Sequence, residues 1–78
     1  MTLDQVKKRV ESLSPQTNAV VMDLTSTENQ YEVKVISPAF TGKSTMERHQ
    51  MIYSLFEKEM KTEEIHALSL STLAPEQA

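Results

Sequence analysis

The chain of 78 residues contains no cysteine, a single glycine and only two histidines. Without cysteine it forms no disulfide, offers no thiolate nucleophile and cannot build a zinc or iron site from sulfur of its own. With Gly42 as its one glycine, it also lacks the glycine-rich loops that bind nucleotide phosphates. The composition therefore removes several classes of enzyme and leaves a chain that is poor in metal ligands.

Long apolar runs and an excess of basic residues are missing as well. No run approaches the roughly 20 apolar residues of a membrane span, so no membrane anchor is expected. The chain does not open with a basic segment followed by an apolar one, so no signal peptide is expected either. The net charge of −3 argues against strong, sequence-independent binding of nucleic acid. These features predict a cytoplasmic protein.

What is present suffices for one small domain, residues 1–78. A chain of this length buries roughly 60–65% of the surface that its unfolded form exposes. It has no room for a deep cleft between two domains.

Helical spacing of apolar residues predicts a first helix over residues 3–13. Thr2 and Gln5 have the spacing of a capping box at its start, and Pro15 follows its end. The basic run at residues 7–9 is more typical of a solvated helix face than of a basic patch.

Two apolar segments, residues 19–24 and 31–36, are separated by the polar loop 25–30 and predict a hairpin. In the second segment polar and apolar residues alternate, which is typical of a half-buried strand. Alternation returns over residues 65–73 and predicts a third strand, whereas the tail 74–78 is expected to be frayed.

A long helix is expected between the second and third strands. Ser44 and Glu47 have the spacing of a second capping box, and the helical pattern continues to about Lys61. His49 falls in the apolar half of this helix, and Arg48 falls at the edge of that half.

The predicted fold class is α+β, with the element order α-β-β-α-β. The strand–helix–strand unit should be right-handed, which makes the third strand parallel to the second. Both helices have one apolar face and should cover one side of a mixed three-stranded sheet. The other side, or an exposed sheet edge, is then where a partner could bind.

Signatures of catalysis are missing from the chain. Serine, histidine and aspartate occur, but no motif arranges them as a triad. The pair Glu63 and Glu64 at a helix end is more typical of a solvated turn than of an acid/base pair. The chain is predicted not to be an enzyme.

The two histidines are expected to differ. For His49 the apolar helix side predicts a partly buried ring that is satisfied by a hydrogen bond, for example to a backbone carbonyl. His66 falls where the helical region gives way to a strand, at the rim of a small sheet, so its imidazole can face solvent. From spacing alone a ligand role is one option for His66, but a single histidine cannot hold a metal.

Residues 40–44 precede the second helix and allow two interpretations. A helix start supplies free amides and a favourable dipole, and Lys43 adds charge, so this stretch could cradle a phosphate. The simpler interpretation, which we favour, is a tight turn into a capped helix.

Two motifs in the chain resemble the BolA family. They are Ser37-Pro38-Ala39-Phe40-x-Gly42-x-Ser44-x-x-x-Arg48-His49, followed by Tyr53, and Ile65-His66-Ala67-Leu68-Ser69. The resemblance covers about residues 30–72, and the order of elements agrees over nearly the whole chain. It implies a fold similar to that of class II KH domains.

The resemblance implies a role for His66. BolA-like proteins pair with monothiol glutaredoxins in iron–sulfur cluster trafficking and iron regulation, and the pair shares a 2Fe-2S cluster. The glutaredoxin cysteine and a glutathione thiol hold one iron, and the BolA-like partner offers the histidine of its Ile-His-Ala-Leu motif, which is His66 here. A neutral imidazole ligates iron well and makes cluster binding depend on pH. Without such a partner, a monomer or a weak homodimer is expected.

The loop at residues 25–30 departs from the family pattern. Relatives often place a second histidine or cysteine ligand there, but this loop has neither. Gln30 stands about where some relatives have their histidine, and an amide is a poor iron ligand, while the carboxylate of Glu28 is a hard one. Either the cluster is bound more weakly, or another group completes it, or the complex forms without a cluster.

The family also implies a rival function, that of a DNA-binding transcriptional regulator that acts in stress responses. In this interpretation Lys43, Ser44 and Arg48 contact the nucleic-acid backbone. Typical KH domains use a Gly-x-x-Gly loop for this contact, and only Gly42 is present here. The adaptor function therefore ranks first and DNA binding second.

Overall fold

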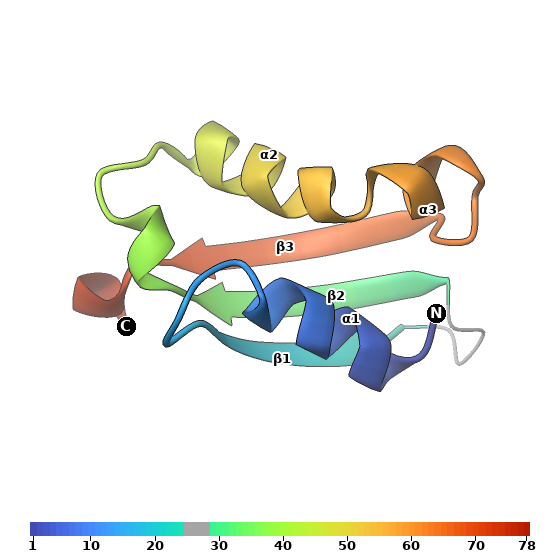
Figure 1. Ribbon diagram of the computed structural model, residues 1–78, viewed down its shortest axis with the longest axis horizontal. Helices are drawn as coiled ribbons and strands as arrows, with labels where there is room; N and C mark the ends of the chain where they lie inside the picture. The colour runs from blue at the N-terminus through green and yellow to red at the C-terminus, as the bar shows by residue number, and fades with distance from the viewer. Residues whose placement is uncertain (25–28) are drawn as a thin grey trace.

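The computed structural model describes residues 1–24 and 29–78 and consists of a three-stranded sheet with helices packed against it (Figure 1). In chain order its elements are α1 (Leu3–Glu11), β1 (Asn18–Asp23), β2 (Gln30–Ile36), the 3-10 turn η1 (Pro38–Phe40), α2 (Thr45–Leu55), α3 (Glu57–Lys61), β3 (Ala67–Leu73) and the 3-10 turn η2 (Pro75–Gln77). The predicted order α-β-β-α-β is confirmed, with the short helix α3 and the two 3-10 turns as additions.

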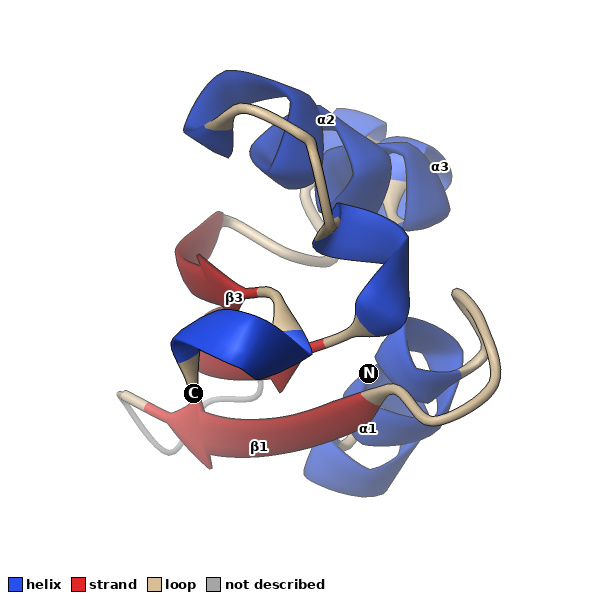
Figure 2. Cartoon of the chain, turned by 90° about the vertical axis from the view of Figure 1, so that its left-hand side faces the viewer, coloured by secondary structure: helices blue, strands red, loops and turns tan. Residues whose placement is uncertain are grey.

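The three strands form one mixed sheet in the order β1-β2-β3. β1 and β2 are antiparallel, with Val21 opposite Val33, while β2 and β3 are parallel, with Tyr31 opposite Leu68. α1 and α2 lie on the same side of this sheet (Figure 2). The predicted mixed sheet with its helices on one face is therefore confirmed.

The core fills the space between the sheet and the helices. Alternation along β2 turns Tyr31, Val33 and Val35 toward the helices, and each of these side chains is at most 1% exposed. The helices contribute the fully buried apolar side chains Val6, Val10 and Ile52, and Phe56, between α2 and α3, adds a fourth. Period-two and period-3.6 patterns in the sequence thus meet in one apolar layer.

Both predicted capping boxes are present. The Gln5 amide donates to Thr2 Oγ1 at 3.2 Å, and the Thr2 amide donates to Gln5 Oε1 at 2.9 Å. At the start of α2 the Glu47 amide donates to Ser44 Oγ at 3.1 Å, and the Ser44 amide donates to Glu47 Oε1 at 2.9 Å. These bonds satisfy amides that the first turn of a helix leaves without a backbone partner.

The helical region ends at Lys61, as predicted, but the prediction of a single long helix is wrong, because the helix is broken at Phe56. Phe56 has φ −119° and ψ 19°, and its amide donates to the Tyr53 carbonyl at 3.0 Å. The separate helix α3 begins at the next residue. Neither proline nor glycine explains this break. Its cause is tertiary, since Arg9 of α1 bonds to the helix backbone here at 3.3 Å, on the Leu55 carbonyl.

The tail also differs from the prediction that residues 74–78 are frayed. Ala74 is fully buried, and the chain then forms η2. The Gln77 side chain accepts from the Ala74 amide at 2.9 Å and from Arg48 Nη1 at 2.7 Å. The buried Arg48 needs hydrogen-bond acceptors, and Gln77 supplies one. This contact orders a segment whose composition alone does not indicate regular structure.

The helices are short. α2 has 11 residues, α1 has nine and α3 has five. Within residues 1–24 and 29–78, no helix combines the length and the apolar character that crossing a membrane requires.

Candidate functional site

His66 lies directly before β3, at the end of the sheet where β2 also begins. Its amide donates to the Asn29 carbonyl at 2.7 Å, and in the sheet Gln30 pairs with Ala67. Because β2 and β3 are parallel, both strands begin at the same end of the sheet. The predicted position of His66 at the rim of the sheet is confirmed, and Asn29, which directly precedes β2, lies beside it.

The side chain of His66 is exposed, whereas the preceding Ile65 is 1% exposed and belongs to the core. No residue in the described part of the chain forms a hydrogen bond to the His66 imidazole. The backbone of His66 is thus anchored on both sides, by Ile65 and by the bond to Asn29, while its ring is open to solvent.

The turn that leads from α3 to His66 is held by backbone and terminal contacts. Glu63 has a left-handed φ of 64°, and the amide of Ile65 bonds back to α3 at 3.1 Å. Glu64 accepts from the N-terminal ammonium of Met1 at 3.1 Å. Both glutamates are exposed, which agrees with the predicted solvated turn.

The described residues, 1–24 and 29–78, include no group of three or more histidine, cysteine, aspartate or glutamate side chains that could hold a metal ion. Of the two second ligands considered, Gln30 is half-buried at the start of β2, and Glu28 lies outside the described residues. Among the described residues, the exposed imidazole of His66 is the candidate ligand that the sequence pointed to, and its ligand role stays a prediction.

His49 is half-buried on α2, as predicted. The hydrogen bond expected for its ring is not found among the described residues. The ring thus lies in the framework of α2, away from the rim where His66 is exposed.

Arg48 is buried, with 8% of its surface exposed. Its Nη1 donates to the Thr72 carbonyl at 3.3 Å and to Gln77 Oε1 at 2.7 Å, and its guanidinium lies 5.9 Å from the centre of the Phe40 ring. Nε has no partner in the described part of the chain. These contacts tie α2 to β3 and to the end of the chain. Little of Arg48 is left accessible, and its Nη1 bonds within the fold, so a nucleic-acid contact by Arg48 stays a prediction that these contacts do not favour.

Lys43 and Ser44, the other two residues of that predicted contact, are exposed before α2. The Lys43 amide donates to the Phe40 carbonyl at 3.0 Å, and Gly42 has φ 77°, a left-handed conformation that favours glycine. The stretch is a tight turn into a capped helix, as favoured from the sequence. The structure does not bring Arg48 onto the same exposed surface.

Two side chains of α2 cover the free edge of β3. The Leu73 carbonyl accepts from the amide of Ser37, which directly follows β2. Because carbonyls alternate along a strand, those of residues 68 and 72 point the other way, toward the free edge of β3. Tyr53 Oη donates to the Leu68 carbonyl at 3.1 Å, and Arg48 binds the carbonyl of residue 72. This edge is therefore blunted against pairing with another strand. The helical pattern contains no signal for this role of Tyr53 and Arg48.

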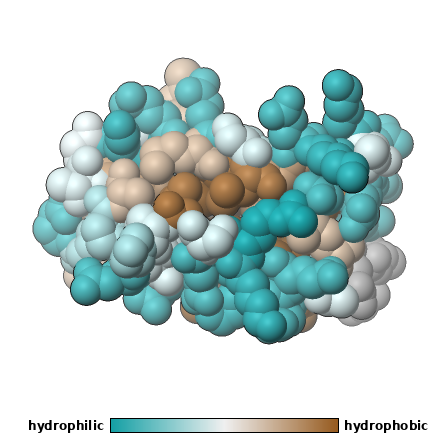
Figure 3. All heavy atoms as spheres, viewed as in Figure 1, coloured by the Kyte–Doolittle hydropathy of each residue, from teal (hydrophilic) through white to brown (hydrophobic). Residues whose placement is uncertain are grey.

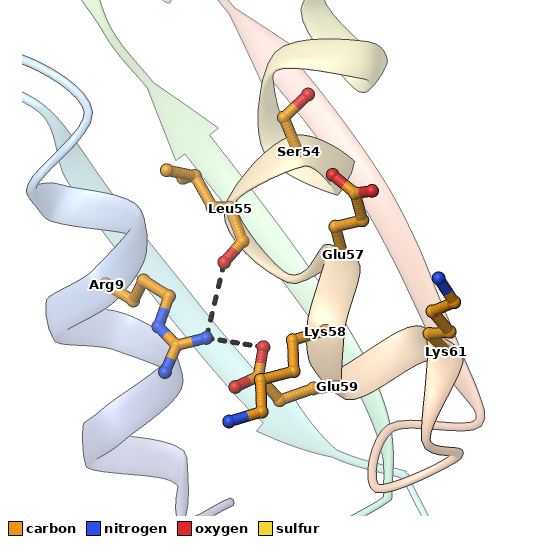
Figure 4. Close-up of a pocket in the computed structure, with 7 residues that line it drawn as sticks. All are labelled: Arg9, Ser54, Leu55, Glu57, Lys58, Glu59 and Lys61. Carbon is orange, nitrogen blue, oxygen red and sulfur yellow. Dashed lines mark hydrogen bonds and ion pairs between the residues drawn. The ribbon is translucent and has the colours of Figure 1, made fainter.

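A hollow of about 510 Å³ lies beside the break between α2 and α3 (Figure 4). Arg9 reaches into it from α1, where its Nη1 donates to the Leu55 carbonyl at 3.3 Å and to Glu59 Oε1 at 2.6 Å. This hydrogen bond lowers the pKa of Glu59. The guanidinium also lies 5.2 Å from the centre of the Phe56 ring. Arg9 is thus a structural contact between the helices, unlike the rest of the solvated run 7–9.

The family profile of BolA-like proteins matches residues 2–77. The chain belongs to the BolA family. Protein BOLA2 of Arabidopsis thaliana is 38% identical to it over 71 residues, which are 90% of this chain and 74% of that protein. The solved BolA domain of SufE1 from the same plant has a TM-score of 0.86 and 27% identity, covering 97% of this chain and 94% of that one.

Another BolA relative is the DNA-binding transcriptional regulator BolA of Escherichia coli (strain K12). It is 42% identical over 45 residues, which are 58% of this chain and 42% of that protein. The BolA fold accounts for the α+β architecture and for His66 at the rim of the sheet, within the matched segment. The similarity to class II KH domains stays a prediction.

Proposed function

We propose that this BolA chain is a non-enzymatic adaptor, active in the cytoplasm, that pairs with a monothiol glutaredoxin in iron–sulfur cluster trafficking or iron regulation. In the pair, His66 supplies one ligand to a shared 2Fe-2S cluster. The observation that supports this most is an exposed imidazole without a protein partner among the described residues, at an edge anchored by backbone bonds.

The chemistry of the chain suits a shared cluster better than one of its own. With no cysteine in the sequence, the thiolates must come from the glutaredoxin and from glutathione. His66 then replaces one thiolate by a neutral ligand, and in 2Fe-2S centres such a replacement raises the reduction potential. Because an imidazole ligand must be deprotonated, we expect binding of the shared cluster to weaken at acidic pH.

His66→Ala should remove the ligand without disturbing the fold, because the side chain is exposed and the anchor is its backbone. The test is anaerobic reconstitution of the chain with a monothiol glutaredoxin, glutathione, iron and sulfide. We expect the visible absorption and circular dichroism of the mixed cluster to change, and its loss to a chelator to become faster. His49→Ala is the matched control and should behave like the wild type.

Two different failures can be told apart in this experiment. Identical cluster spectra and stability for wild type and His66→Ala would refute the ligand assignment. Absence of any complex with the glutaredoxin, with or without iron, would instead refute the partnership.

A second candidate function is DNA binding by a transcriptional regulator, favoured by the description of the Escherichia coli relative. Lys43 and Ser44 are its exposed candidate contacts, whereas Arg48, the third predicted contact, is largely buried. Duplex binding that falls with salt and with Lys43→Glu, in the absence of glutaredoxin binding, would reverse our ranking. Weak binding that is equal for all DNA sequences would count against this candidate.

A further inference from the structure

One side of the sheet is covered by α1 and α2, and no helix among the described residues covers the other side (Figure 2). We call this other side the open face. It is formed by the alternate residues Asn18, Val20, Met22, Gln30, Glu32, Lys34, Ile36, Ala67, Ser69, Ser71 and Leu73. Val20 is 61% exposed and Met22 is 52% exposed, so the open face contains apolar side chains without a cover. Figure 3 views the molecule as Figure 1 does, with α1 in front of the sheet, so the open face lies on its far side.

The strand register arranges the middle of the open face in two rows that run across the sheet. One row is Val20, Lys34 and Ser71, and the next is Met22, Glu32 and Ser69. Each row thus has an apolar residue on β1, a charged residue on β2 and a serine on β3. The two rows differ chiefly in the sign of the charge.

This pattern is complementary to itself. A two-fold axis that runs across the strands between the two rows places each row of one copy on the other row of a second copy. Lys34 then faces Glu32 of the second copy, and Glu32 faces its Lys34. Val20 and Met22 face each other in the same way, and serine faces serine. A two-fold axis along β2 would instead place Lys34 on Lys34, which is repulsive.

The two ends of the open face both carry apolar side chains, and the antiparallel arrangement of the two copies brings these ends together. A shallow groove of about 230 Å³ lies at one end, beside Val20, Ile36 and Leu73. At the other end Leu24, which follows β1, is 52% exposed. The two-fold axis brings Leu24 and Met22 of the second copy to this groove.

We propose that the open face is a self-association surface, on which two copies of this chain pack their sheets antiparallel through the Glu32–Lys34 exchange. Three strands of up to seven residues present only roughly 300 Å². Stable interfaces bury about 800 Å² per partner, so this dimer is weak and forms only at high concentration. His66 lies outside the open face and stays accessible in the dimer. The inference therefore goes beyond the glutaredoxin partnership and does not depend on it.

Sedimentation velocity of the purified chain, from about 10 µM to 1 mM, tests this proposal. We expect the wild type to shift from monomer toward dimer over this range. Lys34→Glu and Glu32→Lys should each weaken association by about tenfold or more, because like charges then meet across the two-fold axis. The double exchange, Glu32→Lys with Lys34→Glu, should restore the dimer.

The charge variants separate a specific contact from a general effect of net charge. Lys34→Glu changes the net charge from −3 to −5, Glu32→Lys changes it to −1, and the double exchange keeps −3. General repulsion would move the two single variants in opposite directions, whereas the proposed contact weakens both. Met22→Lys should abolish association, and Met46→Lys, on the 72% exposed residue of α2, should not. A monomeric wild type at 1 mM, or a double exchange that fails to restore the dimer, would overturn the proposal.

Discussion

His66 and Arg48 belong to the two motifs that resemble the BolA family, yet the fold gives them opposite environments. His66 is exposed at the rim of the sheet, with its backbone bonded to Asn29. Arg48 is buried against Phe40 and bonds to the end of the chain. Of these two residues, therefore, His66 has the exposed side chain, and Arg48 contacts other parts of the fold.

Truncation of the Phe56 side chain should destabilise the protein strongly. It is fully buried at the break between α2 and α3, and the Arg9 guanidinium lies over its ring. Phe56→Ala should cost about 3–5 kcal/mol of unfolding free energy, since it opens a cavity and removes this contact. Urea denaturation followed by circular dichroism measures the loss, and a domain of this size would be close to unfolding. An unchanged midpoint would contradict the burial of this ring.

At the scale of elements, the packing of the helices depends on contacts that cross the chain. Arg9 joins α1 to the break between α2 and α3, and Arg48 joins α2 to β3 and η2. Each arginine donates to a backbone carbonyl of another element, Arg9 to that of Leu55 and Arg48 to that of Thr72. Through such bonds to backbone carbonyls, a guanidinium can orient a neighbouring element without a charge pair.

Arg9→Ala should destabilise the protein by about 1–2 kcal/mol, because the Leu55 carbonyl and the Glu59 carboxylate lose their charged donor. Thermal unfolding with and without the substitution measures the effect. Lys8→Ala is the matched control, since Lys8 is a neighbour on α1 whose ion pair with Asp4 is exposed. We expect a change of less than about 0.5 kcal/mol for the control. Equal effects of both substitutions would contradict a special role of Arg9.

At the scale of the whole molecule, three carboxylates make the stability depend on pH. The Lys7 ammonium and the Ala19 amide lower the pKa of Glu11 from its usual 4.5. The Ser44 amide lowers the pKa of Glu47, and Arg9 lowers that of Glu59. Each group binds its proton less readily in the folded chain than in the unfolded one. Its stabilising contribution is therefore complete above about pH 4.5 and is lost as the pH falls through the lower, folded-state pKa.

We therefore expect the urea midpoint to fall at pH values below about 4.5, where these carboxylates bind protons. Glu59→Gln should lower the midpoint at neutral pH, because the bond from Arg9 loses its charge. Glu59→Gln should also make the urea midpoint depend less steeply on pH in the acidic range, because one titrating group is gone. A variant with the same acid slope as the wild type would show that Glu59 takes no part.

Much of the fold and part of the candidate site follow from local patterns. Alternation along residues 31–36 matches the buried side chains of β2, and the two capping boxes start α1 and α2 where Thr2 and Ser44 indicate. The change from helical to alternating pattern also leads to His66 at the rim. These features depend on neighbours a few residues away, which is why a single sequence suffices to predict them.

What the sequence alone determined is thus the order of the elements, their apolar faces and the exposed histidine. What only the tertiary structure decided is the break at Phe56, the burial of Arg48 and the ordered tail. Each of these depends on a guanidinium that bonds across 24 to 50 residues of chain, to Thr72 and Gln77 in one case and to Glu59 in the other. A pattern of period two or 3.6 records which side of an element is apolar, but it contains no information on which distant carbonyl a long, charged side chain reaches.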